Sequence, residues 1–152
     1  MRVLIDGDAC PVVDSIIELT VETSIFVYIY RSYAHFSHQV FPPHVESIYI
    51  DGGRDAVDFA IIKAIQLNDI VVTQDYGLAS IAIQKTPYVL HHLGYLYTKE
   101  NIDQLLLQRF YSQQERRKSR RHSKGPKPFK DEQRLQFEKT FQSVINQERE
   151  KE

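Results

Sequence analysis

The sequence predicts an α/β fold in three layers, with helices on both faces of a mainly parallel sheet. Short stretches rich in β-branched residues alternate along the chain with longer stretches whose apolar residues recur at helical spacing. Strands separated by helices pair in parallel through right-handed crossovers. The 152 residues, 42% of them hydrophobic, suffice for one sizeable core and not for two.

The first half of the chain is predicted to hold three strands and one helix. Residues 2–6 form an apolar strand that stops where Asp-Gly-Asp requires a turn. Pro11 suits the first position of a helix ending near residue 23, because apolar side chains then recur at i, i+3, i+4, i+7 and i+8. The polar stretch closed by Pro42-Pro43 is predicted to be a surface loop. The other two strands are predicted at residues 24–30 and 45–50.

The second half continues the alternation of helices and strands. The predicted elements are a helix opened by residues 51–55, a strand at 69–73, a helix at 77–85, a strand at 88–91, a helix at 100–115 and a last helix from 131. The glycine and prolines of residues 125–128 exclude a helix there. We therefore expect an α/β domain at residues 1–115, a basic linker at 116–130 and a C-terminal helix at 131–152 that belongs to the same domain.

Composition excludes several classes of protein. No apolar run approaches the roughly 18 residues of a membrane span, and Asp6 comes too early for a signal peptide. The single Cys10 excludes an internal disulfide and a multi-cysteine zinc site, and we expect it to be structural. These observations predict a cytoplasmic protein without a membrane partner and leave its oligomeric state open.

The charge of the chain is unevenly distributed, although the formal net charge is only -1. Eight of the 19 cations lie between Arg116 and Lys130 with no acid among them, which leaves 11 cations against 20 acids elsewhere. An acidic body therefore carries one basic segment. Such a segment can bind a phosphate backbone even when the whole protein is near neutral.

Five aspartates follow predicted strands, and in a parallel sheet the carboxyl ends of the strands are where ligands bind. They are Asp6, Asp8, Asp55, Asp58 and Asp75. Asp51 also follows a strand and is the weakest member of the group, because Gly52-Gly53 can direct it elsewhere. Each aspartate alone would suit a turn or a helix start. Together they indicate a cation site, because grouped carboxylates repel one another unless a cation neutralises them.

Oxygen ligands with open water positions suit Mg²⁺ or Mn²⁺, which would support hydrolysis of a phosphodiester. The predicted ligands are Asp6, Asp8, Asp58 and Asp75. Asp8, Asp55 and Asp58 have three possible roles: ligand, holder of a metal-bound water, or general base. Ser32, just past the second strand, can bind a phosphate or serve only as a turn residue. The histidine pairs at residues 35/38 and 91/92 are assigned to surface or packing roles.

Four ungapped blocks follow one another along the sequence: Ile-Asp-Gly-Asp-Ala-Cys-Pro-Val at residues 5–12, Gly-x-Asp-x-x-Asp at 53–58, Asp-Ile-Val-Val-Thr-Gln-Asp at 69–75 and Tyr-Thr-x-Glu-Asn-Ile at 97–102. In these blocks and their order the sequence resembles the YaiI/YqxD family of bacterial proteins. The resemblance implies a PIN-like domain, and PIN domains are ribonucleases that hold Mg²⁺ or Mn²⁺ with acids at the strand ends. It places the acidic positions on the same five aspartates and not on Asp51. Gly7 departs from the commoner Asp-Ala-Asp and is expected only to loosen the turn.

Two alternatives to a metal-dependent nuclease remain. One is a haloacid-dehalogenase-like phosphatase built on Asp6 and Asp8, although Ala9 replaces the glycine of that motif and the chain leaves no room for a cap. The other is a non-catalytic RNA-binding protein in which the basic segment contacts phosphates and Phe110 and Tyr111 stack on bases. The predicted nucleic-acid contacts are Ser32, Arg116, Arg117, Lys118, Arg120, Arg121, Lys124 and Lys127.

Overall fold

The computed structural model describes residues 1–119 and 127–151. The strands are β1 (Arg2–Asp6), β2 (Phe26–Ser32), β3 (Val45–Ile50), β4 (Ile70–Val72) and β5 (Tyr88–Leu90). The helices are α1 (Val13–Thr20), α2 (Arg54–Ala64), α3 (Tyr76–Ala82), α4 (Lys99–Ser119) and α5 (Asp131–Lys151), with a 3-10 turn, η1, at Tyr33–His35. The predicted alternation of strands and helices is confirmed.

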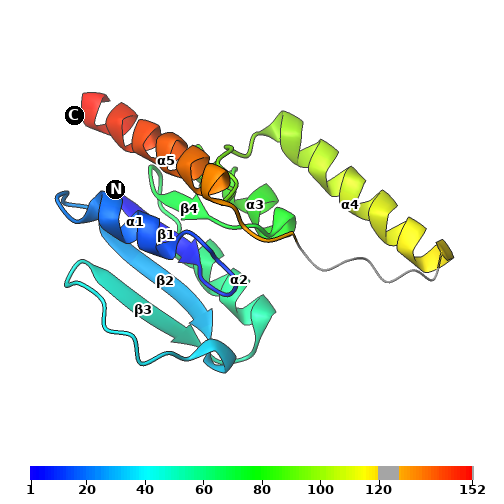
Figure 1. Ribbon diagram of the computed structural model, residues 1–152, viewed down its shortest axis with the longest axis horizontal. Helices are drawn as coiled ribbons and strands as arrows, with labels where there is room; N and C mark the ends of the chain where they lie inside the picture. The colour runs from blue at the N-terminus through cyan, green and yellow to red at the C-terminus, as the bar shows by residue number, and fades with distance from the viewer. Residues whose placement is uncertain (120–126, 152) are drawn as a thin grey trace.

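The strands form a five-stranded sheet in the order β3-β2-β1-β4-β5, and the ladders between these strands are all parallel. Chain order therefore runs outward from β1 on one side and outward from β4 on the other (Figure 1). The two central strands are buried on both faces and carry runs of Val, Leu and Ile, as parallel strands do. Their carboxyl ends lie side by side at the point where the strand order reverses.

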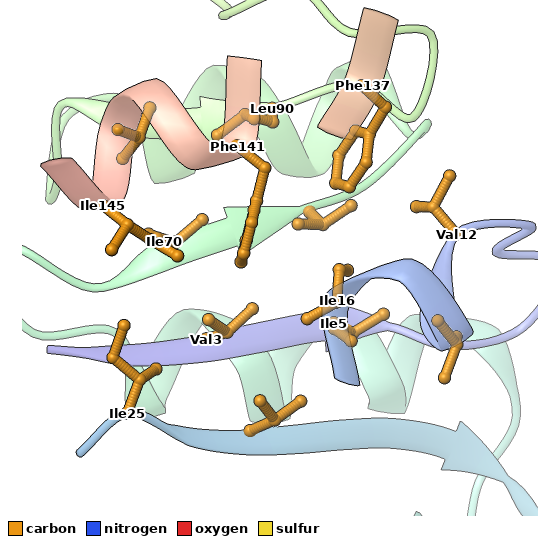
Figure 2. Close-up of a cluster of buried hydrophobic side chains, with 14 of the residues drawn as sticks. Val3, Ile5, Val12, Ile16, Ile25, Ile70, Leu90, Phe137, Phe141 and Ile145 are labelled. Atoms are coloured by element: carbon orange, nitrogen blue, oxygen red, sulfur yellow. The ribbon is translucent and has the colours of Figure 1, made fainter. Parts of the chain in front are cut away.

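Helices α1 and α5 cover one face of the sheet, and Figure 2 shows the core between them and the strands. Phe137 and Phe141 of α5 are fully buried, and their rings stack with centroids 5.7 Å apart. Both rings point toward the sheet in Figure 2, and Phe141 lies beside Ile70. The C-terminal helix thus supplies the largest side chains of this core.

The opposite face is covered by α2, α3 and the start of α4. Val57 and Ile61 of α2, Leu78 of α3 and Ile102 of α4 are all buried in one cluster that also holds Leu4 of β1. With α1 and α5 on the other side, this makes the three-layer α/β arrangement that the sequence predicts.

Contacts at both ends of the fold attach α5 to the body. A Cβ on Gly94, which follows β5, would lie 2.7 Å from the Gln136 carbonyl carbon, so only glycine permits α5 this close approach. The Thr140 hydroxyl donates to the Gly94 carbonyl at 2.7 Å. Near α1, the Ser15 hydroxyl donates to Glu138 Oε1 at 2.8 Å.

Element ends differ from the predictions in ways that local hydrogen bonds explain. α1 ends at Thr20, whose hydroxyl binds the carbonyl of Ile16 and whose own carbonyl accepts from Thr23 N. β2 runs to Ser32, because Arg31 and Ser32 pair with the end of β3.

Helix α4 is longer than predicted and includes the start of the predicted basic linker. α4 continues to Ser119, so Arg116, Arg117 and Lys118 form its last turn and are not part of a linker. Residues 120–126 lie outside the described part of the chain. Within the described ranges, no helix has the length and apolar character needed to cross a membrane.

Candidate functional site at the carboxyl edge of the sheet

Asp6 and Asp75 follow the two central strands and are linked through one hydroxyl group. Thr73 Oγ1 donates to Asp6 Oδ2 at 2.9 Å and accepts from the backbone N of Asp75 at 3.0 Å. Asp75 in turn caps α3 by accepting from Leu78 N at 3.1 Å. The structure therefore brings these two predicted residues to one point, between the ends of β1 and β4.

Thr73 itself is held rigidly, with only 2% of its surface exposed. Its backbone N donates to the Leu90 carbonyl at 3.0 Å, and its carbonyl accepts from Tyr97 Oη at 3.0 Å. A buried hydroxyl with fixed partners positions the Asp6 carboxylate more firmly than solvent would.

Asp8 is oriented by the end of β2. Its two carboxylate oxygens accept from Ser32 N at 3.3 and 3.2 Å, and Oδ1 lies 3.2 Å from His35 Nδ1. The same ring nitrogen lies 3.0 Å from Ser32 Oγ. The predicted nucleic-acid residue Ser32 is thus a buried residue that joins Asp8 to His35.

Gly7 fixes the position of Asp8, contrary to the expectation that it only loosens the turn. A Cβ at Gly7 would lie 2.6 Å from Ile29 Cγ2 and 2.9 Å from Arg31 Cγ. Its backbone N also donates to the Tyr30 carbonyl at 2.8 Å. The turn after β1 is therefore pressed against β2, and this brings Asp8 within reach of Ser32.

A cleft of about 490 Å³ opens at this edge of the sheet. Asp6, Asp8 and Asp51 line it with Gln74 and the η1 segment. Asp51, the weakest member of the predicted group, therefore faces the same space as Asp6. Sequence alone could not decide this, because the two glycines after Asp51 allow many directions.

The other three predicted acids are not among the described residues that line the cleft. Asp75 lies beside it, joined to Asp6 through Thr73. Asp55 is exposed in the first turn of α2, and Asp58 is partly buried one turn further along the same helix.

Oxygen donors of this kind fit Mg²⁺ or Mn²⁺ in an open site and not in a closed cage. Among the described residues, no three Asp, Glu, His or Cys side chains converge closely enough to hold a metal ion. Mg²⁺ is commonly bound through one or two carboxylates, with water and substrate phosphates as its other ligands. The site therefore has the chemistry for an ion that a phosphate helps to bind.

Two further predictions concern groups outside this cleft. Burial raises the pKa of the Cys10 thiol to about 11, so the thiol stays protonated at neutral pH and is a poor nucleophile. Arg116, Arg117, Lys118 and Lys127 are exposed, whereas Arg120, Arg121 and Lys124 lie outside the described residues.

His91 has a packing role at the end of β5. It is 6% exposed and stacks on Tyr95 with ring centroids 4.8 Å apart, while its Nδ1 accepts from Leu93 N at 3.0 Å. Burial, and secondly the neighbouring His92, lowers the pKa of the His91 imidazole to about 4. The ring is therefore neutral in the folded protein at physiological pH.

An all-parallel sheet of this order, with carboxylates at the reversal point, defines a three-layer α/β domain consistent with a PIN-like arrangement. Residues 4–147 match the family described as "Uncharacterized BCR, YaiI/YqxD family". The chain belongs to this family, which confirms the resemblance found in the sequence.

Relatives of similar length support this assignment. A UPF0178 protein of Staphylococcus haemolyticus is 58% identical over 146 residues, which cover 96% of this chain and 98% of the relative. A UPF0178 protein of Staphylococcus epidermidis is 56% identical over 146 residues, with coverage of 96% and 97%. One of Staphylococcus aureus is 52% identical over 145 residues, covering 95% of each chain. No solved structure matches the chain.

The lowered pKa of His91 predicts a loss of stability in acid. The unfolded chain binds a proton near pH 6.5, whereas folded His91 binds it only near pH 4, so its contribution is complete above pH 6.5 and is lost as the pH falls toward 4. We expect His91→Asn, which keeps an acceptor for Leu93 N, to reduce the fall in unfolding free energy between about pH 7 and about pH 5.

Urea denaturation at the two pH values measures this difference. The exposed His38 provides the control for loss of an imidazole, so His38→Asn is compared with His91→Asn and the native protein. An identical fall in His91→Asn and the native protein would contradict the assignment.

Proposed function

We propose that this protein hydrolyses phosphodiester bonds of RNA at the carboxyl edge of its sheet, with the help of Mg²⁺ or Mn²⁺. The observation that carries the proposal is the hydroxyl of Thr73, which joins Asp6 to Asp75 where the strand order reverses. Ligands of open α/β sheets bind at such reversal points. A cleft with several acids beside this point favours a cation and an anionic substrate together.

Asp6 and Asp75 are the residues that would hold the ion. Each follows a central strand, and each is fixed by a hydrogen bond from a rigid element, Thr73 for Asp6 and the start of α3 for Asp75. When bound, the ion would polarise a phosphate oxygen and lower the pKa of a coordinated water. Asp8 would act from the other wall, and Asp58 and Asp55 from α2, each as ligand, water holder or general base.

The exposed half of α4 supports RNA as the substrate. Figure 1 shows α4 leaving the body on the side toward which the strand arrows point. Its last turn carries Arg116, Arg117 and Lys118, and the preceding turns expose Phe110 and Tyr111 by 54% and 59%. Cations with neighbouring aromatic rings suit the phosphates and unstacked bases of single-stranded RNA.

Asp75→Asn tests the catalytic part of the proposal. Asparagine also caps helices, so the fold should persist while a charged ligand is lost. We expect Mn²⁺-dependent cleavage of a labelled single-stranded RNA to fall by about 100-fold or more, the scale of losing one transition-state stabilising group. The exposed Asp103 of α4 provides the matched control, and Asp103→Asn should cleave normally.

Three outcomes would contradict the proposal in whole or in part. Equal cleavage by Asp75→Asn and the native protein would remove Asp75 from the reaction. Cleavage of a phosphomonoester such as p-nitrophenyl phosphate, with none of RNA, would favour the phosphatase alternative. Cleavage of DNA but not RNA would leave the reaction standing and overturn the substrate.

Salt dependence tests the contact between α4 and RNA, and a non-catalytic RNA-binding protein would share this behaviour. Replacing Arg116, Arg117 and Lys118 by glutamine removes three phosphate contacts, so the slope of log affinity against log salt should become shallower by about 2. The exposed Lys63, Lys139 and Arg149 lie on other elements and give a control of equal charge change. Equal slopes for the two triple variants would show that α4 does not contact RNA.

A further inference from the structure

An exposed group of aromatic rings borders the acidic cleft. This aromatic platform consists of Tyr33 and Phe36, which follow β2, and Tyr49 of β3. The ring centroids of Tyr33 and Tyr49 are 5.9 Å apart in a stacked arrangement, and those of Phe36 and Tyr49 are 5.0 Å apart. Tyr33 itself lines the cleft together with Asp6 and Asp8. The platform and the acidic site therefore share a wall.

Tyr49 holds the platform in position. Its hydroxyl accepts from the backbone N of Ser37 at 3.1 Å and donates to the Ser37 carbonyl at 3.3 Å. These bonds fix the segment after η1 against β3, and the Tyr49 ring contacts the rings of both Tyr33 and Phe36. Two large rings are thus pre-oriented before any ligand arrives, which reduces the entropic cost of binding one.

Tyr33 and Phe36 nevertheless remain largely in solvent, with exposed fractions of 59% and 53%. Burying them in the core would recover hydrophobic free energy, and apolar groups exposed together beside a cleft are typical of a surface that an occupant covers. The occupant must be flat to cover a ring face, and it must extend into a cleft lined by carboxylates. An unpaired nucleobase, whose own phosphate reaches the cation site, meets both requirements.

We infer that the aromatic platform stacks an unpaired base of the nucleic-acid substrate and so places the adjoining phosphodiester over the acidic cleft. The inference rests on the proposed function and adds a substrate subsite to it. Bases inside a duplex have both faces covered by their neighbours, so the platform selects single-stranded segments. Every base can stack on an aromatic ring, so the subsite does not discriminate between base sequences.

The test measures the binding of a fluorescently labelled oligouridylate of about ten nucleotides. Binding is monitored by fluorescence anisotropy in EDTA, where cleavage cannot interfere. Tyr33→Ala and Phe36→Ala should each weaken binding by roughly 5- to 100-fold, the range for loss of one stacked base. Tyr33→Phe keeps the ring and should bind normally. Phe26, at the opposite end of β2 and 54% exposed, gives the matched control, so Phe26→Ala should also bind normally.

An abasic oligonucleotide of the same length separates base stacking from phosphate binding. The native protein and the two alanine variants should bind it equally, and more weakly than the native protein binds the oligouridylate. Equal binding of the oligouridylate by Tyr33→Ala, Phe36→Ala and the native protein would overturn the inference, as would a loss of the same size on the abasic strand. Circular dichroism of each variant confirms that the fold is intact.

The same variants distinguish failure of the platform from failure of the proposed function. Weakened binding in Tyr33→Ala, with no Mn²⁺-dependent cleavage by the native protein, would keep the base subsite and reject the nuclease. Normal binding by both alanine variants, with cleavage by the native protein, would keep the nuclease and reject the subsite.

Discussion

The hydrogen bonds at Thr73 connect the fold to its candidate site. One buried hydroxyl binds the Asp6 carboxylate and the backbone of Asp75, and so ties the end of β1 to the end of β4. The reversal of strand order makes these two ends neighbours, since β2 and β3 lie to one side of them and β5 to the other. The acids can therefore meet only if the two core faces assemble the sheet in this order.

Packing explains how a chain of this size supports an acidic cluster. Phe137 and Phe141 of α5 close one face of the sheet, and α2 and α3 close the other, so the three middle residues of β1 and all of β4 are buried. Grouped carboxylates destabilise a fold, and the hydrophobic free energy of these two cores offsets that cost. The Gly94 contact with α5 also contributes to this packing, because it lets the helix lie close enough to fill the core.

Much of the architecture could be predicted from the sequence, because it depends on periodicity. Phe137, Phe141, Val144 and Ile145 recur at helical spacing along α5, and all four are buried. The ends of helices and strands could be predicted less well, because they depend on partners distant in sequence. Ser32 belongs to β2 only because it pairs with Ile50 of β3. Helix α4 remains helical through its basic last turn, although few apolar residues precede that turn to predict a helix there.

The candidate site, like the fold, could be predicted only in part. Residues directly after central strands, such as Asp6 and Asp75, could be placed by topology alone. Tyr33 and His35 belong to η1, directly after β2, and Asp51 directly follows β3. They line the cleft because of how η1 and the two glycines after Asp51 fold, which the sequence does not encode. Thr73 is the last residue of a predicted strand, yet its role depends on a hydrogen bond to a residue 67 positions away.

Titration calorimetry of Mn²⁺ into the metal-free protein, with a bound oligonucleotide to supply phosphate, measures the cation site itself. A cation held by Asp6 and Asp75 requires saturable binding by the native protein and by Asp103→Asn, and its loss in Asp6→Asn and Asp75→Asn. Equal binding by all four proteins, or none by the native protein with the oligonucleotide present, would contradict a cation site at the junction of β1 and β4.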